Sequence, residues 1–287
     1  MRHRWITLLP ALVLVFCYLL TAPTEASACM MQSPQGTGDF DKHDFSGIWF
    51  RAMPRTYGGD CGFGPVGSNP PLTPAGEAEI RKNAPTNTRH PLQQKVGEKD
   101  PGKSNDPALT CNPKGFPQIV VDTAHDHHEV VQTPTRILQI WQEERRLREI
   151  WMDGRPLPSG DNLANLGPSW YGMSVGRWEG DTLVVDTVGL DGRAWLDIYG
   201  FPKSTEARIE ERYKRVDADT MEVQLTLNDP KYYTKPWVSD VKRFKKEARD
   251  AKTVNNFGWY GLFSGLVDLI CAPVNAGGVP SNPRGGD

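Results

Sequence analysis

The sequence lacks the short motifs that mark several common classes of enzyme and binding protein. Its five cysteines form no C-x-x-C pair, and it contains no H-E-x-x-H stretch, no phosphate-binding glycine-rich loop and no run of lysine and arginine. These absences argue against thiol redox sites, zinc ribbons, zincin-type metalloproteases and P-loop nucleotide sites. The formal net charge is only -2, so the chain has no basic field for nucleic acid and we expect no nucleic-acid partner.

Residues 1–28 are typical of a signal peptide. A basic start, MRHRWIT, precedes the apolar run LLPALVLVFCYLL and the triplet Ala26-Ser27-Ala28, which suits a signal peptidase. The apolar run is shorter than the roughly 18 residues expected of a spanning helix. We therefore predict cleavage near Ala28, a periplasmic or secreted mature protein and no integral membrane span after cleavage. An uncleaved anchor and a lipoprotein modified at Cys29 are the alternatives.

Cysteine usage fits an oxidising compartment. Cleavage would leave four cysteines, and four cysteines in an exported chain indicate up to two disulfides with three possible connectivities. We favour a pair between Cys29 and Cys61 and a pair between Cys111 and Cys271.

The mature chain changes character near residue 119. Residues 29–118 are rich in Gly, Pro and Asn, and we expect loops there, with a first strand at Phe45–Ala52 and one short helix beginning at Thr73-Pro74. Residues 119–254 instead show short runs of alternating apolar and polar residues separated by turn residues, which predicts strands. The predicted strands are 119–123, 129–133, 136–143, 146–153, 173–179, 181–189, 208–216, 220–228 and 237–245.

The strand pattern predicts a mainly β protein whose core is an antiparallel up-and-down β-barrel of the lipocalin or calycin type. The strands begin about ten residues apart without intervening helices, and a barrel leaves no sheet edge exposed. Residues 255–287 are expected to form a short amphipathic helix, from the helical spacing of apolar residues between Trp259 and Ile270, followed by a disordered tail. The helix is expected to cap the barrel, with attachment to a membrane surface as the alternative.

Several longer motifs carry a family resemblance that covers most of Cys111–Trp237. These are CNPKGFP, EVVQTP, IWMDGRPLP and above all PSWYGMSVGRWEGDTLVVDTVGL. The chain resembles a group of exported bacterial β-rich proteins without an established activity, and the resemblance implies a lipocalin-like fold. Relatives carry histidines at four positions where this chain has Arg145, Leu157, Met173 and Lys203, so the resemblance implies a different activity or none.

The stretch AHDHHE holds the candidate catalytic residues His125, Asp126, His127 and Glu129. On a strand, His125, His127 and Glu129 share one face, while Asp126 and His128 point the other way. A histidine beside a carboxylate in a partly apolar cavity can transfer protons near neutral pH. His125 and His127 are also spaced to bind one metal ion, although other strands would have to supply further ligands. A solvated polar strand end is the structural alternative.

Aromatic residues near strand ends are candidates for lining a ligand cavity, with ordinary core packing as the alternative. Arg155 belongs to one of two Asp-Gly-Arg sequences, in which Asp-Gly favours a tight turn and the arginine can hold an anionic group. The predicted ligand-binding residues are Trp141, Trp151, Arg155, Trp170, Tyr171 and Trp195.

These patterns lead to three functional hypotheses. The first is an exported enzyme that needs no cofactor and uses His–carboxylate acid–base chemistry, as an isomerase, cyclase, lyase or hydratase, on a small apolar or aromatic substrate held in the cavity of the β-barrel. The second is a periplasmic protein that binds such a molecule without turnover. The third is a metal-dependent enzyme that uses His125 and His127.

Overall fold

The protein is built around one sheet of ten strands. A computed structural model describes residues 39–51, 61–65, 68–122, 127–141 and 146–247. All of these belong to the structural unit Pro34–Asp287, and the chain's other unit, Met1–Ser33, lies outside the described residues. The strands are β1 (Gly47–Arg51), β2 (His127–Gln132), β3 (Arg136–Trp141), β4 (Leu147–Trp151), β5 (Met173–Glu179), β6 (Thr182–Val188), β7 (Arg208–Asp217), β8 (Thr220–Asn228), β9 (Trp237–Val238) and β10 (Lys242–Lys246).

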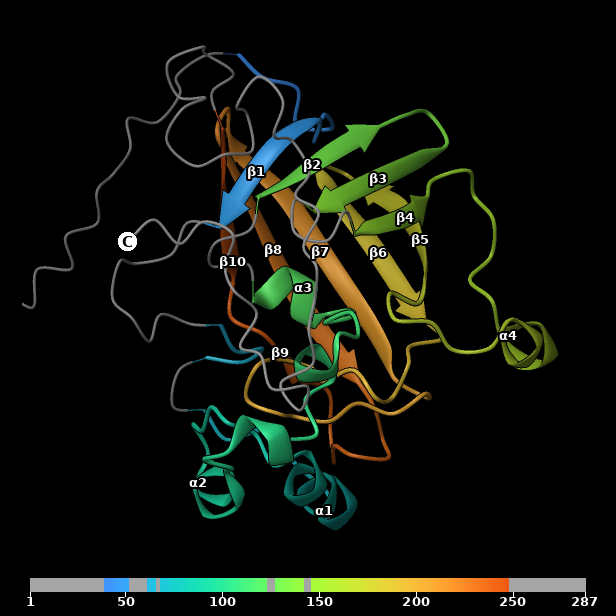
Figure 1. Cartoon of the computed structure of the whole chain (residues 1–287). Coiled ribbons are helices and arrows are strands. Elements are labelled where there is room, and N and C mark those ends of the chain that lie inside the picture. The colour runs from blue at the N-terminus through green and yellow to red at the C-terminus, as the bar shows by residue number, and fades with distance from the viewer. Residues whose placement is uncertain (1–38, 52–60, 66–67, 123–126, 142–145, 248–287) are drawn as a thin grey trace, which may run out of the picture. The chain divides into compact units, whose positions relative to one another are not determined.

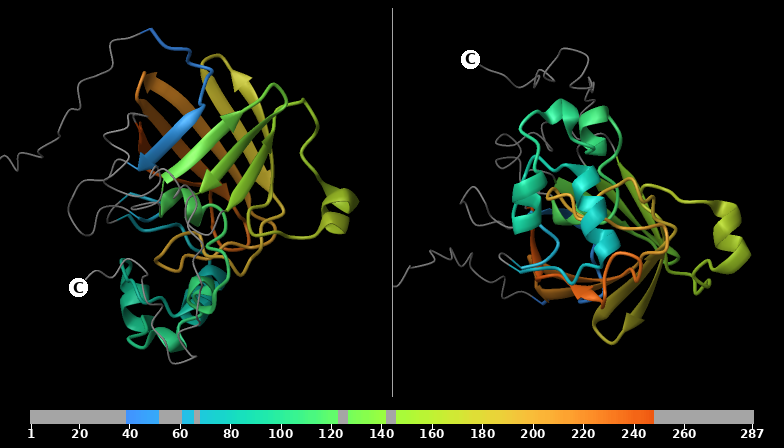
Figure 2. Two further views of the ribbon diagram at one scale, coloured as in Figure 1. Left: turned by 45° about the horizontal axis from the view of Figure 1, so that its top comes forward. Right: turned by 90° about the horizontal axis from the view of Figure 1, so that it is seen from below.

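Nine of these strands close into a barrel, as predicted. The order in the sheet is β10-β1-β2-β3-β4-β5-β6-β7-β8-β9. β10, the first strand of this order, also pairs with β8, and this pairing closes the ring of nine strands (Figures 1 and 2). β9 pairs only with the last residues of β8. β1, from the loop-rich N-terminal region, completes the ring between β2 and β10. Closure leaves fewer strand edges exposed, which is the reason for expecting a barrel.

One pairing departs from the predicted antiparallel meander. β4 and β5 run parallel, with Ile150 opposite Ser174 and Trp151 opposite Val175. A parallel pair requires a crossover connection, and residues 152–172, which include α4 (Gly160–Leu166), provide it. The barrel is therefore mixed, and the prediction of purely antiparallel pairing was wrong at this one junction.

The helices are more numerous than predicted. The predicted helix forms as α1 (Pro74–Asn83), where the Thr73 hydroxyl accepts a hydrogen bond from the backbone N–H of Gly76. The predicted strand 119–123 is instead helix α3 (Gln118–Val121). The other helical elements are α2 (Pro91–Val96) and the 3₁₀ turns η1 (Pro101–Lys103) and η2 (Pro107–Thr110). The predicted strand 237–245 is divided into β9 and β10, and the predicted C-terminal helix lies outside the described residues.

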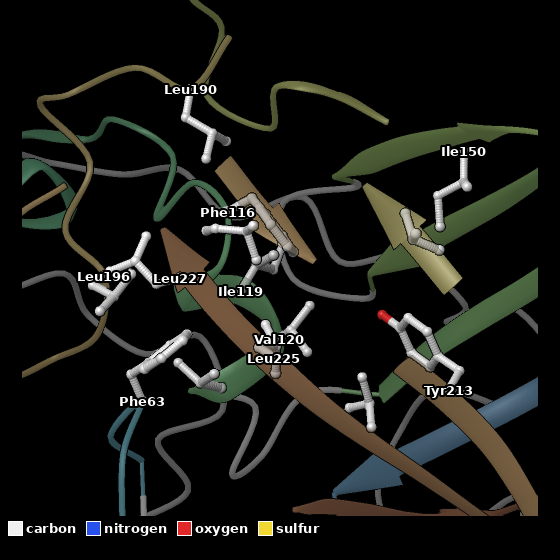
Figure 3. Packing of buried hydrophobic residues seen from close by; sticks show 14 of the residues in the cluster. Phe63, Phe116, Ile119, Val120, Ile150, Leu190, Leu196, Tyr213, Leu225 and Leu227 are labelled. Atoms are coloured by element: carbon white, nitrogen blue, oxygen red, sulfur yellow. The ribbon is translucent and has the colours of Figure 1, made fainter. Parts of the chain in front are cut away.

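The centre of the barrel holds a packed core to which α3 contributes. Arg51 at the end of β1 donates a hydrogen bond of 2.6 Å to the carbonyl oxygen of Val121, which holds α3 against the strands. Phe116, Ile119 and Val120 join the same buried cluster as residues of β7 and β8 (Figure 3). Buried apolar residues of these strands include Ile209, Tyr213, Met221, Val223, Leu225 and Leu227.

Candidate functional site

The predicted histidine cluster lies at the start of β2, and the strand separates its members. His125 and Asp126 lie outside the described residues, and β2 begins at His127. His127 and Glu129 lie on one face of the strand and His128 on the other, which is the predicted alternation. His128 pairs across the strands with Trp49 and Trp141, both almost fully buried, so its face is the interior of the barrel.

His127 is on the outer face of the barrel. Its ring lies 5.5 Å from that of Phe50, and its Nε2 lies 3.8 Å from Oε2 of Glu247. Burial lowers the pKa of His127 below the ordinary value for histidine. His127 and Glu129 therefore do not face the interior in which a substrate was expected.

His128, which was not among the predicted site residues, is the histidine that enters the barrel. Its ring stacks on Trp141, with centroids 5.4 Å apart, and meets the edge of Phe244 at 5.3 Å. Burial, and to a lesser extent the neighbouring His127, lower the pKa of His128 to about 3. Its imidazole is therefore neutral at physiological pH.

His128 and Trp141 line a narrow pocket together with Val120, Gln139, Tyr213 and Phe244. The pocket comprises about 190 Å³ of space between atoms, counting its open side, but no part of it is wide enough for a free water molecule. Nδ1 of His128 and Nε1 of Trp141 are buried and have no hydrogen-bond partner among the described residues. Buried polar atoms are almost always paired in folded proteins. Nδ1 of His127 and Nε1 of Trp195 are also buried without a partner among the described residues, but only the nitrogens of His128 and Trp141 belong to residues that line this pocket.

A buried ion pair adjoins this pocket inside the barrel. Arg148 on β4 donates hydrogen bonds of 3.1 and 2.5 Å to the two carboxylate oxygens of Glu211 on β7, and both side chains are almost fully buried. The hydroxyl of Tyr213 donates to Glu211 at 2.5 Å, and Gln139 accepts from Arg148 at 3.2 Å. The face of the Phe116 ring lies 3.9 Å from the guanidinium. The charges of Arg148 and Glu211 thus compensate each other next to the pocket.

The hydroxyl of Ser174 accepts hydrogen bonds from Arg148. Ser174 also belongs to a sequence motif that was not among the predicted site residues. Residues 172–176, GMSVG, match the G-x-S-x-G pattern of the hydrolase nucleophile elbow. That elbow requires a sharp turn from a strand to a helix and an exposed hydroxyl. Ser174 lies instead within β5, is 1% exposed, and bonds Arg148 and Thr187. The motif therefore has a structural role here.

Trp151 and Arg155 lie on the outer surface and do not reach the interior. The Arg155 guanidinium stacks on Trp151, 3.6 Å from the ring centroid, and donates to both carboxylate oxygens of Asp153 at 2.9 and 2.6 Å. Gly154 takes a φ of +78°, so the first Asp-Gly-Arg sequence forms the predicted tight turn. Because Asp153 occupies its guanidinium, Arg155 is not placed to hold a ligand in the barrel.

Most of the remaining predicted ligand-binding residues also lie away from the pocket. The guanidinium of Arg193 stacks on Trp170, 4.8 Å from the ring centroid, and forms an ion pair with Asp191. The second Asp-Gly-Arg sequence therefore has the same arrangement as the first. Trp195 is buried in the loop between β6 and β7, and Tyr171 packs against the core. Trp141 is the one predicted ligand-binding residue that lines the His128 pocket.

The structure leaves the disulfide and metal predictions open. Cys29 and Cys271 lie outside the described residues, and the two described cysteines, Cys61 and Cys111, are not bonded to each other. Within the described ranges no three residues of His, Cys, Asp or Glu come together as metal ligands, and His125 is not among the described residues. The helices that the structure describes are all too short or too polar to cross a bilayer.

Comparison with known proteins adds no assignment. No family model matches the chain, and neither the curated proteins nor the solved structures include a similar protein. The resemblance to exported β-rich bacterial proteins therefore stays a prediction.

Proposed function

We propose that this protein is exported and that its barrel binds a small, largely apolar or aromatic molecule in the pocket of His128 and Trp141. The supporting observation is the pair of unpaired ring nitrogens that belong to two residues of this one pocket. A buried polar group without a partner costs about 1–3 kcal/mol. A ligand that supplies the missing hydrogen bonds removes this cost, and its binding energy compensates for the instability of the empty site.

Binding without turnover agrees better with the geometry than acid–base catalysis does. A general base works best when its pKa lies near the operating pH. The pKa of His128, lowered by burial to about 3, makes this imidazole a weak base at neutral pH but leaves it a good hydrogen-bond partner. His127 and Glu129 of the proposed catalytic set lie on the outer face instead.

The narrowness of the pocket sets a condition on binding. The space lacks room for a free water molecule, so a ligand enters only when lining side chains move. Val120 and Phe244 are the two aliphatic or phenyl side chains of the lining, and neither makes a side-chain hydrogen bond that movement would break. The energy of this rearrangement lowers the observed affinity, and we expect micromolar or weaker dissociation constants.

The proposal is tested by titrating the purified mature protein with a panel of small apolar and aromatic molecules in a calorimeter. We expect saturable binding at one site for part of the panel. Trp141→Phe should weaken it about tenfold, the equivalent of one hydrogen bond. Trp151→Phe, which changes a tryptophan on the outer surface, is the matched control and should leave the affinity unchanged. Absence of saturable binding by the wild-type protein would contradict the proposal.

Acid–base catalysis remains the second candidate and keeps one supporting observation. His127 has a carboxylate, that of Glu247, at 3.8 Å, close enough to form a hydrogen bond after a small movement. If this hypothesis holds, a His125→Ala/His127→Ala variant loses turnover of a substrate while it retains ligand binding at the interior pocket. Unchanged turnover by that variant would remove the hypothesis.

A further inference from the structure

The chemistry of the pocket restricts the kind of molecule it can hold. Resting on the proposed function, we infer that the ligand is uncharged and that it presents an oxygen acceptor, such as a carbonyl, ether or hydroxyl, to Nε1 of Trp141, with an otherwise apolar body. Three features of the pocket support this inference.

The first feature is the indole of Trp141. An indole Nε1–H can donate a hydrogen bond but cannot accept one, so an acceptor atom is required opposite it. Trp141 is 1% exposed, and within the described residues nothing accepts from its Nε1. A pure hydrocarbon would fill the space and leave this donor unpaired.

The second feature is the imidazole of His128, whose ring stacks on that of Trp141 at an interplanar angle of 20°. A neutral imidazole carries one N–H and one lone pair, and the tautomer decides which of them Nδ1 presents. A carbonyl or ether oxygen can accept from Nδ1–H as well as from the indole. A hydroxyl can accept from the indole and donate to an Nδ1 lone pair. Both kinds of oxygen therefore match the hydrogen-bonding chemistry of the two rings.

The third feature is the charge of the surroundings. The six lining residues are Val120, His128, Gln139, Trp141, Tyr213 and Phe244, and none carries a formal charge when His128 is neutral. The neighbouring Arg148 is paired with Glu211 and so offers no uncompensated charge. A buried ion without a partner is strongly disfavoured, so a carboxylate or an ammonium group does not suit this pocket.

Three probes of similar size and different chemistry test the inference: cyclohexanone, methylcyclohexane and cyclohexanecarboxylate. Their dissociation constants are measured on the full mature chain by ligand-observed NMR. We expect cyclohexanone to bind about tenfold more tightly than methylcyclohexane, as one hydrogen bond predicts, and the carboxylate to bind most weakly. Trp141→Phe should remove the preference for the ketone and leave the affinity for the hydrocarbon unchanged.

The outcomes separate this inference from the function on which it rests. If none of the three probes binds the wild-type protein, the proposed binding function fails. If methylcyclohexane binds as tightly as the ketone, or if the carboxylate binds best, the pocket binds ligands but the inferred chemistry is wrong. The ranking of probes on the wild-type protein needs no variant, so it decides the question even if Trp141→Phe does not fold.

Discussion

At the scale of single residues, His128 links the candidate site to the stability of the protein. Burial lowers its pKa from 6.5 to about 3, so between these values the unfolded chain binds a proton that the folded chain does not. The free energy of unfolding therefore rises with pH across this window, and acid destabilises the fold by up to about 1.4 kcal/mol per pH unit through this group.

We expect His128→Phe to lose less stability than the wild-type protein between pH 7 and pH 5, as measured by urea unfolding at both values. Phenylalanine keeps the aromatic contacts with Trp141 and Phe244 and has no proton to bind. Trp151→Phe changes an outer-surface residue that binds no proton and serves as the control, with the same acid loss as the wild type. Equal losses for His128→Phe and the wild type would show that His128 does not titrate as its burial predicts.

The ion pair of Arg148 and Glu211 gives a second prediction at this scale. Arg148→Met leaves a buried carboxylate without its cation, which is expected to cost about 3–5 kcal/mol. The double variant Arg148→Met/Glu211→Leu should recover most of that loss, because no buried charge is left unpaired. Arg136→Met removes the cation of a partly exposed pair with Glu149 and should cost about 0–1 kcal/mol in the same chemical denaturation experiment. Similar costs for Arg148→Met and Arg136→Met would contradict the burial argument.

At the scale of elements, the strands with strict alternation were predictable, whereas the short, fully buried helix α3 was mistaken for a strand. β8 has the predicted bounds because Met221, Val223, Leu225 and Leu227 alternate with polar residues. All four residues of α3 are buried, so the sequence shows no alternation there. A short run of apolar, β-branched residues is compatible with a buried strand or a buried helix, and tertiary packing decides between them.

The position of α3 leads to a prediction about the pocket. Val120→Ala removes two methyl groups from the lining and is expected to cost about 1–3 kcal/mol of stability. It should also tighten binding of cyclohexanone about threefold or more, because less of the binding energy is used to open the pocket. Ile119→Val, on the same helix but not in the lining, should cost stability without changing the affinity. An unchanged affinity for Val120→Ala would place the ligand elsewhere.

At the scale of the whole molecule, the pocket of His128 and the buried ion pair beside it could not be predicted, because their residues meet only through the register of the closed barrel. Arg148, Ser174 and Glu211 come from three strands, and only the ring of pairings brings them together. A partial signal was present, because Glu211 alternates in phase with the buried Ile209 and Tyr213. Likewise His128 is in phase with Val130, and that pattern indicates that His128, not His127, faces inward.

The buried titratable groups together shape the dependence of stability on pH. Burial lowers the pKa of Lys203 to about 7 and raises that of Asp197 to about 6. Between pH 3.8 and 6 the folded chain holds a proton on Asp197 that the unfolded chain has lost. Through this group the free energy of unfolding falls as pH rises, which is opposite to the effect of His128 in that range. Burial also raises the pKa of Tyr213 and Tyr233 above 10, so these groups reduce stability only at higher pH. Stability should therefore be greatest on the alkaline side of neutrality.

Lys203 provides a test of that expectation. The pH range in which it affects stability lies above that of Asp197 and below that of the two tyrosines. Its ammonium group donates to the carbonyl oxygens of Asp191 and Ala194 in a position that is 1% exposed. Between pH 7 and 10.5 the unfolded chain keeps the proton that the folded chain has released, so the free energy of unfolding rises with pH in this range. Below pH 7 the lysine is charged in both states, and the cost of burying its charge does not change with pH. Relative to Lys203→Met, the wild-type protein should gain up to about 3 kcal/mol between pH 7 and pH 9 in urea unfolding. A difference between the two proteins that stays the same at both pH values would mean that Lys203 remains charged in the fold, held by its carbonyl partners against the cost of burial.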